Sequence, residues 1–98
     1  MPKIYEYFGL VFLFYSNDHK PVHVHVKNGE KETKFVFVYS KGMLVHIKQI
    51  DSSIPLTSKQ KNEAIKFIQK FHLKITSKWY DFFVLNKKIK CHKIKKKI

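Results

Sequence analysis

The first half of the chain alternates apolar and polar residues with the two-residue period of β-strands. Turn residues such as Ser16-Asn17-Asp18 and Asn28-Gly29 separate the alternating segments. Pro21 lacks a backbone N–H, so the strand that contains His23 is expected to begin at or after it. Because every connection is short, we expect consecutive segments to pair antiparallel, as a meander of four or five strands. The predicted strands span residues 4–7, 10–15, 22–27, 34–39 and 43–50.

After residue 57 the apolar positions recur every three or four residues, which is the period of an α-helix. Thr57 or Ser58 can cap the start of this helix. One apolar stripe, which Leu73 helps to widen, runs through residues 57–83 without a break. It predicts either one long helix or two shorter helices with a kink near His72. The stripe consists of Ala64, Ile68, Phe71, Ile75, Trp79 and Phe82.

Together these patterns predict one α+β domain over residues 1–86. In it, an antiparallel four- to five-stranded meander sheet packs on one long or two shorter C-terminal helices. Trp79 is expected in the core, with its indole nitrogen bonded to a backbone oxygen. Strand 10–15 is apolar on both faces, whereas the helix covers only one face of the sheet. We therefore expect the second face to contact a partner protein or a second copy of the chain, as in a homodimer.

Charge adds a candidate class of partners, because the chain has 20 basic and 7 acidic residues and a net charge of +13. Such a charge favours polyanions, among them RNA, DNA and acidic proteins. All the basic residues are lysines, which also fits a genome biased toward lysine codons, because phosphate recognition often uses the bidentate guanidinium of arginine. More than half of the excess charge lies in residues 87–98, which we expect to form a disordered, lysine-rich tail.

Three further features indicate a cytoplasmic protein without membrane contact. No apolar run approaches the roughly 18 residues needed to cross a bilayer. The N-terminus does not resemble a signal peptide. Cys91 is the single cysteine, so no internal disulfide can form.

The most distinctive segment of the chain is the histidine-rich stretch HKPVHVHVK, residues 19–27. Side chains alternate across a strand, so His23, His25 and Lys27 share one face and the valines share the other. The two imidazoles then stand about 6.5–7 Å apart along the strand. His19 precedes the strand and is expected to lie near them.

These histidines allow three interpretations. In metal-independent RNA cleavage, His19, His23 and His25 would supply a general base and a general acid. Lys20 and Lys27 would then bind the phosphate, and Tyr15 would orient it. These three residues and the three histidines are the candidate site residues.

In the second interpretation, His23 and His25 bind a divalent metal, with His19 or Asp18 as a third ligand. No fourth ligand is evident, so no metal or cofactor is assigned from the sequence. In the third, the histidines only make local hydrogen bonds.

The stretch FYSNDHKPVHVHVK, residues 14–27, resembles the F-Y-S-N-[DE]-H-x-P-x-H-V-H-V signature of a small bacterial family, the domain of unknown function numbered 4160. Trp79 followed by Phe82-Phe83 matches the end of the family's helix. The resemblance covers residues 1–83 and leaves the lysine-rich tail outside. Members often have arginine where this chain has Lys27, which keeps the charge and loses bidentate phosphate geometry.

The resemblance implies a role, because the genes of this family often lie beside another small domain in an arrangement similar to a type II toxin–antitoxin module. It implies that this chain is the toxin, neutralised by a cognate antitoxin-like protein. The leading hypothesis is therefore a toxin that acts on RNA through His19, His23 and His25. The alternative is a non-catalytic module that binds a partner or a metal, with histidines that are structural or ligate the metal.

Overall fold

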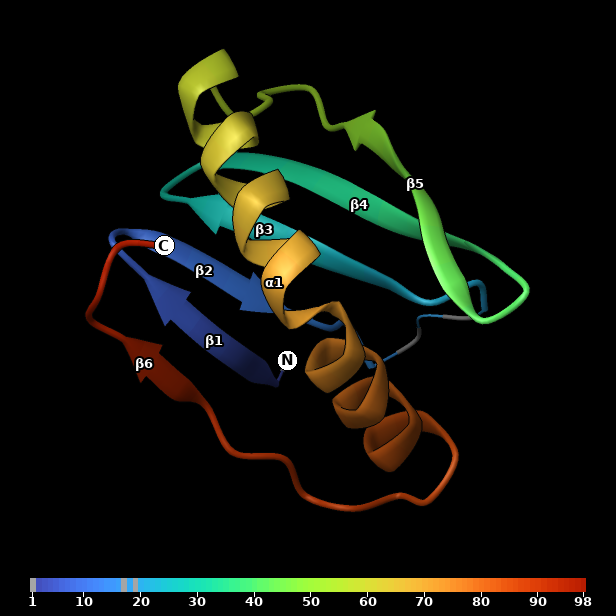
Figure 1. Ribbon diagram of the computed structural model, residues 1–98. Helices are drawn as coiled ribbons and strands as arrows, with labels where there is room; N and C mark the ends of the chain where they lie inside the picture. The colour runs from blue at the N-terminus through green and yellow to red at the C-terminus, as the bar shows by residue number, and fades with distance from the viewer. Residues whose placement is uncertain (1, 17, 19) are drawn as a thin grey trace.

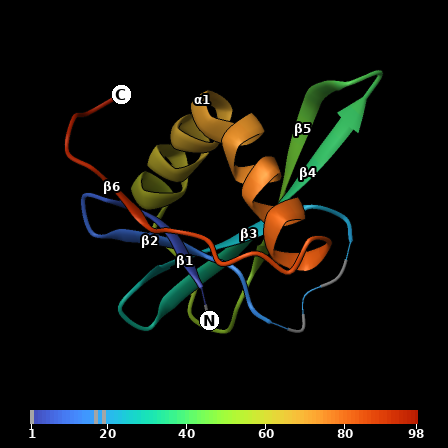
Figure 2. The same cartoon turned by 90° about the horizontal axis from the view of Figure 1, so that it is seen from below.

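The computed structural model describes residues 2–16, 18 and 20–98, in which a sheet forms one layer and a helix packs across one of its faces (Figures 1 and 2). The α+β class predicted from the sequence is therefore confirmed. The elements are β1 (Lys3–Tyr7), β2 (Leu10–Leu13), β3 (His23–Asn28), β4 (Lys31–Ser40), β5 (Met43–Asp51), α1 (Ser58–Phe83) and β6 (His92–Ile94).

The sheet has six strands in the order β5-β4-β3-β2-β1-β6. From β1 to β5 each strand pairs antiparallel with the next, as the predicted meander does. β6 adds a parallel pairing to β1, with Tyr5 opposite His92 and Tyr7 opposite Ile94. The prediction of four or five strands, all antiparallel, is therefore wrong at this edge. β6 comprises three residues of the lysine-rich tail, which is too short for a strand pattern to be visible in the sequence. By pairing with β1 it covers backbone groups that would otherwise be unpaired at the edge of the sheet.

Helix α1 is one element of 26 residues, and it bends near its middle (Figure 2). It begins after Thr57, whose hydroxyl accepts from the Gln60 N–H while the Gln60 side chain accepts from the Thr57 N–H. Trp79 is buried as predicted. Its Nε1 has no hydrogen-bond partner among the described residues, so the predicted bond to a backbone oxygen is wrong. Leu73 is 68% exposed and does not widen the buried stripe.

The core lies between α1 and the face of the sheet that carries the β3 valines. Phe67 is at its centre and is fully buried. Its ring lies 4.5 Å from that of Phe12, 5.0 Å from that of Tyr7 and 5.2 Å from that of Tyr5, measured between centroids. No helix in the described part of the chain is both long enough and apolar enough to cross a membrane.

The opposite face of the sheet is covered in part by Tyr15 and Asp18, which follow β2 and contact the β3 histidines. Leu13 points to this face and is 2% exposed, whereas Val11 is half-buried. The apolar excess predicted for this face is therefore partly covered within the chain itself. Apolar side chains remain exposed farther along, on β4 and β5, where Val38 is 40%, Val45 59% and Ile50 40% exposed.

Replacing Phe67 with alanine tests the central position of this ring. Deleting a fully buried phenylalanine removes its packing and leaves a cavity, so the free energy of unfolding should fall by about 3–5 kcal/mol. Urea denaturation followed by circular dichroism measures the change. Leu73→Ala, at an exposed position of the same helix, is the control and should change stability by less than about 0.5 kcal/mol. Equal losses in the two variants would contradict the assignment of the core.

Candidate functional site

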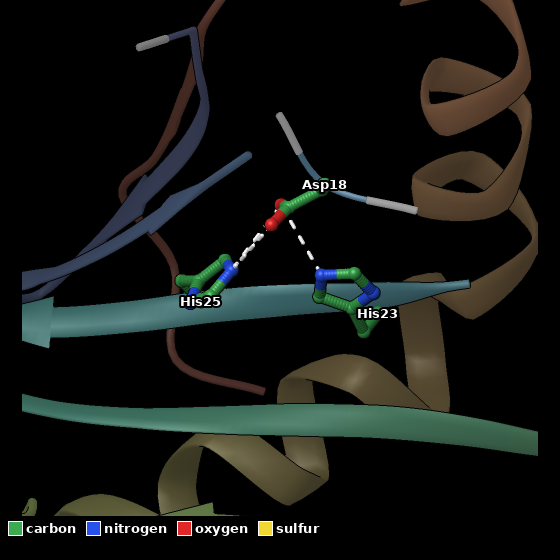
Figure 3. Close-up of side chains that lie close together, drawn as sticks. All are labelled: Asp18, His23 and His25. Carbon is green, nitrogen blue, oxygen red and sulfur yellow. Dashed lines mark hydrogen bonds and ion pairs between the residues drawn. The ribbon is translucent and has the colours of Figure 1, made fainter. Parts of the chain in front are cut away.

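Strand β3 places both of its histidines on the face of the sheet that is opposite α1 (Figure 3). Val24 and Val26 are fully buried on the helix side, so the alternation of the strand turns His23 and His25 to the other side. The two rings lie 5.2 Å apart between centroids, and the residues are 5% and 8% exposed. The predicted shared face of the two histidines is thus present, but both side chains are buried.

Asp18 lies directly over the two imidazoles (Figure 3). A tight turn holds it there, because the Tyr15 N–H donates to Asp18 Oδ2 at 2.9 Å and the Asp18 N–H donates to the Tyr15 carbonyl at 3.0 Å. His23 Nε2 and His25 Nε2 each lie 3.2 Å from Asp18 Oδ2. Asp18, His23 and His25 each offer one ligand atom, and these three atoms lie within 4.8 Å of one another.

Glu32 on β4 joins the cluster from the neighbouring strand, and the sequence analysis did not identify it. Its Oε2 lies 3.2 Å from His25 Nδ1, and its Oε1 accepts a 2.7 Å hydrogen bond from the Tyr15 hydroxyl. The register of the β3–β4 hairpin, in which Lys27 is opposite Glu32, turns this carboxylate to the histidine face. The two-residue loop of this hairpin is Gly29-Glu30, because Asn28 pairs with Lys31, and a glycine at the first loop position was the sequence signal that could have predicted this register.

The other predicted site residues are distributed around this cluster. Tyr15 is part of it, although its hydroxyl donates to Glu32 instead of pointing to a free phosphate position. Lys27 is half-buried on the histidine face, and Lys20 is exposed with its Nζ 5.4 Å from the centre of the Tyr80 ring. His19 lies outside the described residues.

The electrostatics of the cluster favour an ionised Asp18. Burial raises the pKa of its carboxyl, but the Tyr15 N–H together with His23 and His25 outweighs burial and lowers the pKa below its ordinary value. Burial and the hydrogen bond to Glu32 raise the pKa of Tyr15 to about 12. The cluster therefore contains a carboxylate held ionised and a tyrosine held neutral around two imidazoles.

This geometry limits direct proton transfer to an external substrate. A general acid or base needs a ring nitrogen within hydrogen-bond reach of the reacting group. Here the Nε2 atoms of His23 and His25 face Asp18, and the Nδ1 atoms face Pro21 and Glu32. The acid–base interpretation stays a prediction that requires one of these nitrogens to become accessible.

A second candidate site is a groove of about 330 Å³ between α1 and the β1–β6 edge. Lys78 Nζ donates to the Lys90 carbonyl at 3.0 Å, lies 3.2 Å from His92 Nδ1, and sits 5.4 Å from the centre of the Tyr5 ring. Burial lowers the pKa of the Lys78 ammonium. No acidic residue is among its lining residues, which are Tyr5, Phe71, Lys74, Ser77, Lys78, His92 and Ile94.

A stripe of lysines on α1 borders this groove, and the tail lies beside it. Lys66, Lys70, Lys74 and Lys78 are spaced four residues apart and form a stripe along α1. The tail runs back beside the helix (Figures 1 and 2), since Lys78 contacts Lys90 and Lys97 Nζ lies 3.2 Å from Glu63 Oε1. The groove therefore lies between the helix lysines Lys74 and Lys78 and the β6 residues His92 and Ile94 of the tail.

Comparison with known proteins adds the family of the chain. The family model described as Domain of unknown function (DUF4160) matches residues 9–80. This chain belongs to the DUF4160 family. The match includes the whole histidine cluster, whereas β1 and β6 lie outside it. No curated protein and no solved structure matches the chain.

The hydrogen bond between Tyr15 and Glu32 gives a prediction for alkaline pH. Folding raises the pKa of Tyr15 from its ordinary value of 10.0 to about 12. The stability that the protonated hydroxyl contributes is therefore fully present below pH 10.0 and is lost as the pH rises toward about 12. Glu32→Gln removes the neighbouring negative charge and should move the pKa of Tyr15 toward 10.0. NMR of ¹³C-labelled tyrosine measures both values. Glu30→Gln, on the same hairpin but exposed, is the control and should leave the titration unchanged.

Proposed function

We propose that this protein binds single-stranded RNA in the groove between α1 and β6, and that it does so as the toxin component of a toxin–antitoxin pair. The observation that carries the proposal is a groove that Lys74, Lys78 and His92 line together with the aromatic rings of Tyr5 and Phe71. The toxin role comes from the family resemblance, and RNA binding is the activity that the charge and shape of this surface support best.

The arrangement of charge supports a polyanionic ligand. Lysines that follow one another on the helix stripe repel each other, and an RNA backbone would neutralise them. The Lys78 ammonium is partly desolvated and its contacts in the described structure are neutral acceptors and a ring. Phosphate oxygens are the groups that would complete its hydrogen bonds.

The aromatic rings support a single strand over a duplex. Proteins that bind single strands combine a basic groove with side chains on which unpaired bases stack. Phe71 is half-buried at the groove, with Lys70 Nζ 5.8 Å and Lys74 Nζ 5.7 Å from its ring centre. A base at this ring would have lysines within reach of the adjoining phosphates.

The exposed apolar side chains of β4 and β5 support contact with a protein partner. The β4–β5 hairpin extends beyond the helix (Figure 2), and Met43 at its tip is 70% exposed. The cognate antitoxin-like protein that the resemblance implies would cover this apolar surface, and a homodimer is the other arrangement that would do so. Light scattering of the pure protein separates the two, because only self-association gives twice the chain mass without a partner.

The double variant Lys70→Gln, Lys74→Gln tests RNA binding at the groove. Two lost phosphate contacts should weaken binding and reduce the slope of log K against log salt by about 1.4, at about 0.7 for each contact with a single strand. Fluorescence anisotropy with a labelled single-stranded RNA measures both quantities. The matched control is Lys41→Gln, Lys48→Gln, which removes the same charge at the β5 edge.

Equal weakening in the two double variants would contradict the proposal, since it would assign binding to net charge alone. Equal affinity for single-stranded RNA and single-stranded DNA would retain the groove and remove the preference for RNA.

The predicted catalytic role of the histidines has a separate test. If His23 acts on RNA, His23→Gln should relieve the growth arrest caused by expression of the protein while RNA binding is retained. Growth curves and anisotropy are compared for the wild type, for His23→Gln and for His46→Gln, a control at an exposed position on β5. Arrest that persists in a folded His23→Gln variant would remove this histidine from the toxic activity.

A further inference from the structure

We propose that Asp18, His23 and His25 bind one divalent transition-metal ion of the zinc class, through Asp18 Oδ2 and the Nε2 atoms of both histidines. The two histidines are buried, the Asp18 side chain is 11% exposed, and the three ligand atoms lie close together where Asp18 faces β3 (Figure 3). Two imidazoles and one carboxylate favour such an ion over Mg²⁺ or Ca²⁺, which prefer oxygen ligands. This inference does not depend on RNA binding at the groove.

The hydrogen bond of His23 fixes which nitrogen is free to bind. Its Nδ1 lies 2.8 Å from the Pro21 carbonyl oxygen, which can only accept, so Nδ1 carries a proton. Nε2 is then the free nitrogen. It is buried, lies 3.2 Å from Asp18 Oδ2, and has no hydrogen-bond partner in the described part of the chain. A protonated Nε2 would be close enough for ionic attraction, but its N–H would not align with the oxygen, whereas a metal ion between the two atoms would satisfy both.

His25 has the same orientation. Its Nδ1 lies 3.2 Å from Glu32 Oε2, and its Nε2 lies 3.2 Å from both carboxylate oxygens of Asp18, a hydrogen bond that a bound metal ion would replace. Histidines that bind metals commonly donate the N–H of their other nitrogen to a carboxylate or a backbone carbonyl, which orients the ring. His25 has the carboxylate of Glu32 in that position, and His23 has the carbonyl of Pro21.

Two of the three separations between ligand atoms also fit, and the third, between the two Nε2 atoms, is within 4.8 Å. An ion with tetrahedral bonds of about 2.0–2.1 Å holds its ligand atoms about 3.3 Å apart. Both Nε2 atoms are already 3.2 Å from Asp18 Oδ2. Three protein ligands leave one position for water or substrate, as in catalytic zinc sites.

Tyr15 and Glu32 form the outer layer of this site. The Tyr15 hydroxyl donates a hydrogen bond to Glu32 Oε1, and the other oxygen, Oε2, is placed to accept one from His25 Nδ1. The Tyr15 ring also lies 4.3 Å from the His25 ring, edge to face. Glu32 is therefore a positioning residue that acts through His25.

Titration of the untagged, metal-free protein with Co²⁺ and Zn²⁺ tests the proposal. Co²⁺ should produce the visible absorption of a tetrahedral site at one equivalent per chain, and Zn²⁺ should displace it. Asp18→Asn and His23→Gln should abolish this binding, Glu32→Gln should weaken it about 10- to 100-fold, and His46→Gln should leave it unchanged. Circular dichroism establishes that each variant is folded.

Nitrogen NMR of the wild-type protein provides a test that needs no variant. Added Zn²⁺ should shift the Nε2 resonances of His23 and His25 and leave both Nδ1 atoms protonated. Absence of binding at one equivalent, coordination through Nδ1, or binding that His46→Gln removes would each overturn the proposal. In the first case the cluster would be a network of buried ion pairs, and in the third a surface histidine would hold the metal.

Discussion

The structure depends on strand β3 being buried on both of its faces. Its valines need only apolar neighbours, which α1 and the adjoining strands provide. Its imidazoles are polar, and burying them without partners would cost free energy, so their face requires oxygen atoms at defined positions. Asp18 provides these oxygens from the connection after β2, and Glu32 provides them from β4. The need of the β3 histidines for these oxygens therefore constrains both the turn after β2 and the register of the β3–β4 hairpin.

A second constraint is the repulsion among lysines. Exposed charges separated by more than about 10 Å are largely screened at ordinary salt, so an excess of lysines opposes folding only weakly. The lysine stems are apolar and can cover rings, and an ammonium group can lie over an aromatic face, as that of Lys78 does at Tyr5. This explains how a tail rich in lysine can pack beside a helix that carries a lysine stripe.

The parts of the fold that local patterns determine could be predicted from the sequence. Strands 22–27 and 34–39 and the helix from 57 to 83 were identified because alternation and helical spacing follow from the stereochemistry of neighbouring residues. β6 could not be identified, because three residues next to lysines carry no period and their pairing depends on the unpaired edge of β1. In the site, His23 and His25 were predicted together, and Asp18 was named only as a third ligand. Glu32 was missed because its place depends on hairpin register.

By itself the sequence determined that His23 and His25 share one face of a strand and that the valines share the other, since the backbone of a strand alternates its side chains wherever the strand is placed. It also determined the excess of lysine and the apolar stripe of the helix. The tertiary structure alone decided that Asp18 lies over both imidazoles, that Glu32 orients His25, and that the tail meets the helix lysines. These contacts join residues that are distant along the chain or separated by turns, so they depend on how the whole sheet pairs and on which surfaces the connections cover.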